Sequence, residues 1–178
     1  YDSLYCWLRY GEIQSNKEVY PKFDVEKLKE ISNKIRELAD MPFLEQYENI
    51  KKILKECGVA LVFEKHLPNT YVNGVSYKIT CDKAIIMLSD RGKKDDILWF
   101  TLFHEIAHLI KHSKKEVFVD LENDESNDIE LEADEFARNI LIPDNIYIEF
   151  VQSNIVYNEK VIRDFSNKNN ISTGIVVG

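Results

Sequence analysis

Two segments between residues 24 and 57 carry apolar residues at the three- and four-residue steps of an amphipathic helix. The first segment begins after Asp24, a suitable N-cap residue, and extends to about Ala39. Pro42 lies where the second helix can begin, and Gly58 lies where it can end. We therefore predict two helices with one apolar face each, formed by Val25, Leu28, Ile31, Ile35 and Leu38, and by Leu44, Tyr47, Ile50, Leu54 and Cys57.

The periodicity then changes to short runs that are rich in β-branched residues and typical of strands. These runs cover residues 59–63, 71–72, 75–79 and 84–88. Asn73 and Gly74 lie between the second and third runs, a pair that is typical of a hairpin turn. The pattern predicts a small antiparallel sheet of three or four strands.

Helical spacing returns in the second half of the chain. Asp95 and Asp96 suit the first turn of a helix that continues to about His112. A second helix is expected after Asp128 and ends at Pro143. Two shorter helices, near residues 144–153 and 158–168, are expected to follow.

These elements predict an α+β fold, with residues 1–22 as a leading helix and connector and residues 23–178 as one domain. A chain of 178 residues, 44% hydrophobic and 30% charged, is long enough for one sizeable core. The first residue is Tyr1, and the final apolar pattern stops at Gly178. We expect both ends to continue in a longer protein, which would include a missing N-terminal region.

The net charge of -8 disfavours sequence-independent binding to nucleic acid, because the chain lacks the basic excess that neutralises phosphates. Three cysteines, an odd number without C-x-x-C spacing, indicate neither a disulfide framework nor a cysteine zinc site, which fits a reducing cytoplasm. No apolar run approaches the roughly 18 residues that a membrane span needs. The expected location is therefore the cytoplasm, without membrane contact.

Residues 104–108 read His-Glu-Ile-Ala-His and continue an apolar run on the predicted helix. Positions four apart share a helix face, so His104 and His108 can bind one tetrahedral zinc ion. Glu105 can then serve as general base toward a water molecule at that ion. The motif predicts a zinc peptidase site, and a structural pair of histidines is the simpler alternative.

A catalytic zinc ion also needs a third protein ligand. No histidine lies beyond His112, and position 114, where an H-E-x-x-H-x-x-G-x-x-H site has its third histidine, is a lysine. A carboxylate of the following helix remains, with four candidates: Glu130, Glu132, Asp134 and Glu135. Glu130 and Asp134 share one face, so we predict Glu130 as the ligand and Asp134 as the group that orients a histidine; Glu132 and Asp134 remain alternative ligands.

Other residues near the motif are expected to have structural roles. His66 is interpreted as a surface residue, and Arg138 as a surface or ion-pair residue. Tyr71 and Tyr77 are interpreted as packing residues of the sheet, although an exposed strand edge there could pair with a peptide substrate.

Three stretches together resemble the ImmA/IrrE family of zinc metallopeptidases: WFTLFHEIAHLI at residues 99–110, ELEADEFA at 130–137 and LIP at 141–143. The flanks WLRYGE at 7–12 and GIVVG at 174–178 are similar to the HigA-type branch, in which an XRE helix-turn-helix precedes the metallopeptidase domain.

This resemblance implies a zincin-like fold, zinc bound by His104, His108 and Glu130, and Glu105 as the base. It also implies cleavage of a helix-turn-helix repressor, or an antitoxin role with a cognate toxin as partner. DNA contact would then belong to a helix-turn-helix region absent from this chain, and a homodimer is compatible with such a regulator.

The leading hypothesis is a cytoplasmic zinc metalloendopeptidase domain of a transcriptional regulator or antitoxin. A rival is a non-catalytic binding module with a structural or idle zinc site, whose acidic block at residues 116–135 docks a basic toxin. A third alternative is a zinc hydrolase that acts on something other than peptides.

Overall fold

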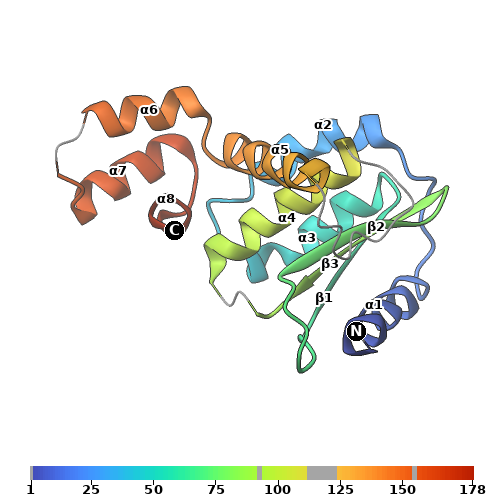
Figure 1. Cartoon of the computed structure of the whole chain (residues 1–178). Coiled ribbons are helices and arrows are strands. Elements are labelled where there is room, and N and C mark those ends of the chain that lie inside the picture. The colour runs from blue at the N-terminus through green and yellow to red at the C-terminus, as the bar shows by residue number, and fades with distance from the viewer. Residues whose placement is uncertain (1, 92–93, 112–123, 154–155) are drawn as a thin grey trace.

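A computed structural model of the chain describes residues 2–91, 94–111, 124–153 and 156–178, with residues 124–127 described for their backbone alone (Figure 1). Helices precede, cover and follow a small sheet. In chain order the elements are α1 Asp2–Ser15, α2 Val25–Arg36, α3 Phe43–Lys55, β1 Val59–Glu64, β2 Gly74–Thr80, β3 Lys83–Ser89, α4 Asp95–Lys111, α5 Asp124–Leu141, α6 Asp144–Ser153, α7 Glu159–Asn169 and α8 Thr173–Val177.

The sheet is mixed, with strand order β1-β3-β2. β2 and β3 pair antiparallel, whereas β1 and β3 pair parallel, so the prediction of an antiparallel sheet is wrong for one of its two strand pairs. The β2–β3 hairpin places β3 beside β1 and leaves β2 at the edge. Strand periodicity fixes which residues share a face, but it does not fix which strands become neighbours.

The predicted hairpin turn at Asn73 and Gly74 is also wrong. Residues 71–72 form no strand, and β2 begins at Gly74, which pairs with Leu88. A tight type I′ turn needs positive φ at both central residues, and neither of these two has it.

Side chains of β1 and β3 alternate between two apolar clusters, one on each face of the sheet. One face packs against the layer of α2, α3 and α4, through residues such as Leu61 and Ile86. The opposite face packs against α1, through Trp7 and Leu8. Because both faces are covered, these strands are continuously apolar rather than alternating.

The first two predicted helices are confirmed, with their end signals. The carboxylate of Asp24 accepts a hydrogen bond from the backbone N–H of Lys27 at 3.0 Å, and so caps α2. Gly58 has φ of 79° after α3, a conformation that glycine adopts without strain. The predicted helices after Asp95 and around 144–153 and 158–168 are confirmed as α4, α6 and α7, whereas α5 begins before Asp128 and α8 was not predicted.

Arg36 joins α2 to the C-terminal half of the chain. Its guanidinium donates hydrogen bonds at 2.8–3.1 Å to the backbone carbonyls of Ile140, Leu141, Asn169 and Asn170. Helices α6, α7 and α8 lie to one side of the sheet and its covering helices in Figure 1. Since Ile140 and Leu141 lie at the end of α5, the hydrogen bonds from Arg36 also fix the helix that packs against α4.

Among the described residues, none of the helices is long and apolar enough to cross a membrane.

Candidate metal and catalytic site

The site forms where α4 and α5 pack against each other. On α4, Phe103, Ile106 and Ala107 are fully buried and hold the helix in the core, which leaves His104 and His108 together on a half-buried face. On α5, Ala133 and Ala137 are fully buried, and their small side chains permit close approach of the two helices. This contact turns the acidic face of α5 toward the two histidines.

The structure brings His104, His108 and Glu130 around one point. Nε2 of His104 lies 2.9 Å from Nε2 of His108 and 3.0 Å from Oε2 of Glu130, while Nε2 of His108 lies 3.4 Å from Oε1 of Glu130. A tetrahedral zinc ion with bonds of about 2.0–2.1 Å separates its ligand atoms by roughly 3.3 Å. The donor types and their spacing therefore fit a divalent metal ion held by these three residues.

The charges at this point favour a cation. Hydrogen bonds from His104 and His108 hold the pKa of Glu130 well below its usual range. Burial lowers the pKa of His104, but its hydrogen bond with Glu130 and the nearby carboxylates outweigh burial, so that the pKa is raised. The site thus stabilises positive charge between two imidazoles and a carboxylate. A metal ion would replace the proton there, so metal affinity should fall with acidification.

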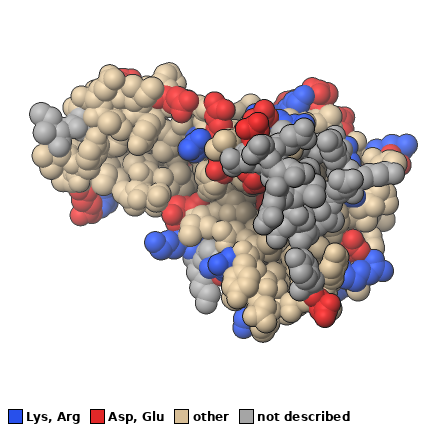
Figure 2. All heavy atoms as spheres, viewed as in Figure 1, with Lys and Arg blue, Asp and Glu red and all other residues tan. Residues whose placement is uncertain are grey.

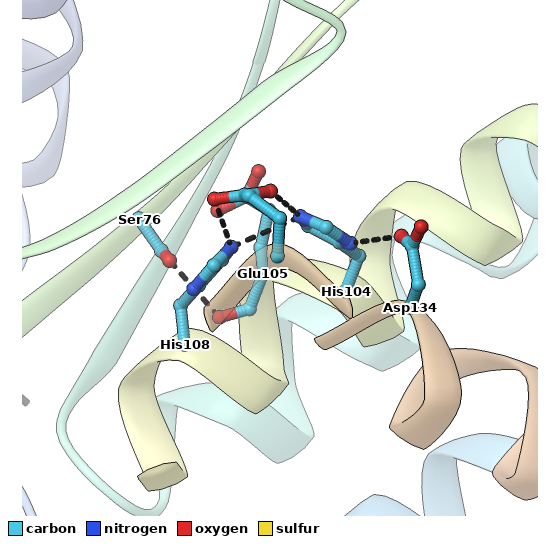
Figure 3. Close-up of polar contacts among 6 residues, drawn as sticks. Ser76, His104, Glu105, His108 and Asp134 are labelled. Atoms are coloured by element: carbon cyan, nitrogen blue, oxygen red, sulfur yellow. Dashed lines mark hydrogen bonds and ion pairs between the residues drawn. The ribbon is translucent and has the colours of Figure 1, made fainter. Parts of the chain in front are cut away.

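Asp134 lies on the other side of His104. Its Oδ1 is 2.9 Å from Nδ1 of His104, so the ring nitrogen that faces away from Glu130 has a carboxylate partner (Figure 3). Such a contact fixes the tautomer and the ring orientation of a metal-binding histidine. Asp134 is thereby placed as a positioning residue, one helical turn beyond Glu130. Neither Glu132 nor Glu135 belongs to the cluster of the three ligand atoms.

We expect Asp134→Ala to weaken zinc binding by about 10–100-fold, because His104 would lose the contact that holds its ring. Competition titration against a zinc chelator measures this change. Glu135→Ala is the matched control, since Glu135 is an exposed neighbour on the same helix. Equal affinities of the two variants would contradict the positioning role of Asp134.

Glu105 lies beside the ligand cluster, where the edge strand β2 covers it. Its side chain is therefore buried, and the residue is only 6% exposed. Burial raises the pKa of its carboxyl group, and the effects of His108, Ser76 and His104 oppose this increase. A carboxylate whose pKa is moved toward neutrality is better suited to accept and return a proton.

Two residues of β2 contact Glu105 and were not predicted as part of the site. The hydroxyl of Ser76 donates a hydrogen bond at 2.9 Å to the backbone carbonyl of Glu105. In Figure 3, Ser76 and Asp134 approach the two histidines from opposite sides. A Cβ atom at Gly74 would lie 2.5 Å from Cγ2 of Thr101 and 3.0 Å from Oε1 of Glu105. A glycine within a strand could have indicated this close approach, whereas no local signal marks Ser76.

Gly74→Ala should lower the free energy of unfolding by about 1–3 kcal/mol and disturb Glu105, because Thr101 is buried and β-branched and cannot move aside easily. Urea unfolding measures the change in stability. Adding Thr101→Ser removes the methyl group that clashes, and we expect the double variant to recover most of the loss. A double variant as unstable as Gly74→Ala would exclude this clash as the cause.

Residues outside the cluster mostly have structural contacts. His66 forms a 2.6 Å contact from Nδ1 to Oδ1 of Asp90. Tyr77 is buried and donates a hydrogen bond to Glu12 Oε1, which confirms its packing role. Tyr71 is 73% exposed, so the interpretation of this residue as a packing residue is wrong. His112, the last residue of the predicted motif helix, lies outside the described residues.

A comparison with curated proteins found no match to this chain. A scan against protein families matches residues 56–176 to a peptidase family described as IrrE N-terminal-like domain. The matched part contains the two histidines, Glu105, Glu130 and Asp134, and it confirms the resemblance at the level of the family. The HigA-type branch stays a prediction. Since the match covers more than half of its length, the chain belongs to the IrrE N-terminal-like domain family of peptidases.

Proposed function

We propose that this chain is the zinc-dependent metalloendopeptidase domain of a transcriptional regulator or antitoxin. It would act in the cytoplasm, with a zincin-like arrangement of its site, on a peptide bond of a regulatory protein such as a helix-turn-helix repressor. The observation that carries the proposal is the convergence of His104, His108 and Glu130 beside the buried carboxylate of Glu105.

Two imidazoles and one carboxylate are a donor set of catalytic zinc sites, which keep a further position for water or substrate. The zinc ion, when bound, supplies a Lewis acid that acidifies water and polarises a peptide carbonyl. Glu105 accepts the proton of the attacking water and returns it to the leaving amine. Asp134 holds the ring of His104 during this exchange through its 2.9 Å contact.

One of the two edges of the sheet is open to pairing with an extended peptide, which supports a peptide as substrate. The outer edge of β1 is already engaged, because the hydroxyl of Tyr47 donates to the carbonyl of Leu61 and accepts from the N–H of Phe63, both at 3.2 Å. β2 is the other edge strand, and it packs against α4, the helix that carries Glu105. Within the described part of the chain no strand pairs with its outer side, so an extended substrate could add there.

The rival binding module relies on the acidic block at 116–135. Residues 116–123 of this block lie outside the described residues, and Glu130 and Asp134 contact the histidines instead of facing a partner. The buried carboxylate of Glu105 beside this cluster favours the enzyme. A repressor-like substrate, a cognate toxin and a homodimer remain proposals for its partners.

The test is proteolysis by the purified, zinc-loaded protein. Helix-turn-helix repressors and the product of the neighbouring gene are incubated with it, and cleavage sites are mapped by mass spectrometry. We expect cleavage that stops on chelation and returns when zinc is added back. Stoichiometric zinc together with intact candidates and an intact random peptide library would refute the peptidase proposal in favour of the binding module or of a non-peptide hydrolase.

A further inference from the structure

A cavity of about 560 Å³ extends from the candidate site toward the C-terminal helices. One end is lined by His104 and Glu105, and the remainder is largely apolar. Figure 2 shows that this face of the molecule is hollowed between the C-terminal helices and the rest of the chain, with acidic and basic side chains on the rim. The apolar wall combines residues of α4, of the end of α5 and of α8: Ile97, Phe100, Leu141, Ile142 and Ile175.

Arg138 is the one lysine or arginine among the described residues that line this cavity. It follows Glu130 and Asp134 at four-residue steps along α5, so all three share the face that is turned toward the site. Its side chain is exposed, and its guanidinium forms no hydrogen bond or ion pair with the residues that the structure describes. The guanidinium of Arg36, in contrast, donates hydrogen bonds to four backbone carbonyls.

The acidic residues that line the cavity form no ion pair with Arg138. Asp134 contacts His104, and Asp96 lies in the first turn of α4 against Gly178. Glu105 is buried beside the candidate metal site, where a divalent cation would balance its charge. The guanidinium therefore remains available at the mouth of an apolar cavity, where it can bind a carboxylate through two parallel hydrogen bonds.

We infer that Arg138 is a specificity-determining residue, which selects peptides that carry an acidic side chain within two positions of a large apolar residue. The apolar residue fills the wall formed by α4, α5 and α8, and the carboxylate pairs with Arg138 at the rim. The inference rests on the proposed function, since it places a peptide substrate in this cavity. It goes further by naming the charge that the cavity selects.

The experiment measures binding separately from cleavage. Fluorescent octapeptides contain one leucine and one variable residue, Glu, Gln or Lys, placed one or two positions from the leucine on either side. Their affinity for the zinc-loaded Glu105→Gln variant is measured by fluorescence anisotropy, and their cleavage by wild type is followed in parallel. We expect the best glutamate peptide to bind about tenfold more tightly than its glutamine counterpart, and the lysine peptide to bind more weakly than both.

Charge reversal at Arg138 provides the decisive comparison. In Arg138→Glu, combined with Glu105→Gln, the preference should invert in favour of the lysine peptide. Arg163→Glu is the matched control, because Arg163 is an exposed arginine of α7 outside this cavity, and the preference should persist there. A merely structural role of Arg138 would weaken all peptides equally and would leave their order unchanged.

The outcomes separate this inference from the proposed function. Charge-selective binding without cleavage by wild type would retain the role of Arg138 and refute the peptidase. Cleavage without a charge preference would retain the peptidase and refute the role of Arg138. Absence of binding by every peptide, or a preference that Arg138→Glu leaves unchanged, would also overturn the inference.

Discussion

Replacing Glu105 with glutamine should reduce peptide hydrolysis by about 10²–10⁴-fold and leave the zinc content unchanged. Glutamine has nearly the same shape as glutamate, so it can occupy the buried position under β2 without displacing Gly74. It cannot accept a proton at neutral pH, however, and the proposed base would be lost. The measurement combines kcat/KM on a cleaved peptide with metal analysis of the same preparation.

Glu135→Gln is the control for this experiment, because it removes the charge of an exposed glutamate on α5 that lies outside the cluster of ligand atoms. The control should retain full activity and full zinc content. Equal hydrolysis by Glu105→Gln and wild type, with equal zinc in both, would remove Glu105 from the mechanism.

Replacing Glu130 with alanine should weaken zinc binding by more than about 100-fold, because it removes one of three ligands rather than a group that orients a ligand. Hydrolysis should then disappear at ordinary zinc concentrations. Metal content after dialysis and chelator competition measure the loss. The pKa of Glu130, held low by His104 and His108, already indicates that this carboxylate is stabilised by positive charge at the site.

Glu132→Ala tests whether this effect is local. Glu132 is close in sequence, but its carboxylate lies 3.7 Å from Nζ of Lys111 and outside the ligand cluster. We expect this variant to bind zinc as wild type does. Loss of zinc from Glu132→Ala, with retention in Glu130→Ala, would exchange their roles and contradict the geometry described above.

Much of the helical structure could be predicted because it depends on local periodicity and end signals. Asp24 caps α2 and Gly58 follows α3 with positive φ, as their positions indicated. The sheet was predicted less well, because the partner of a strand depends on segments distant in sequence. The parallel pairing of β1 with β3, and the role of Gly74 in packing rather than in a turn, were decided by that arrangement.

The sequence by itself determined the metal-binding motif. The four-residue spacing of His104 and His108 places both rings on one helix face, and the same spacing selects Glu130 and Asp134 as a pair. Only the tertiary structure decided that α5 packs against α4 with its acidic face toward those rings, that Ser76 reaches Glu105 from β2, and that Arg138 and α8 line the same cavity. The physical reason is that helix geometry is set by hydrogen bonds between residues four apart, whereas contacts between elements depend on how the whole core packs.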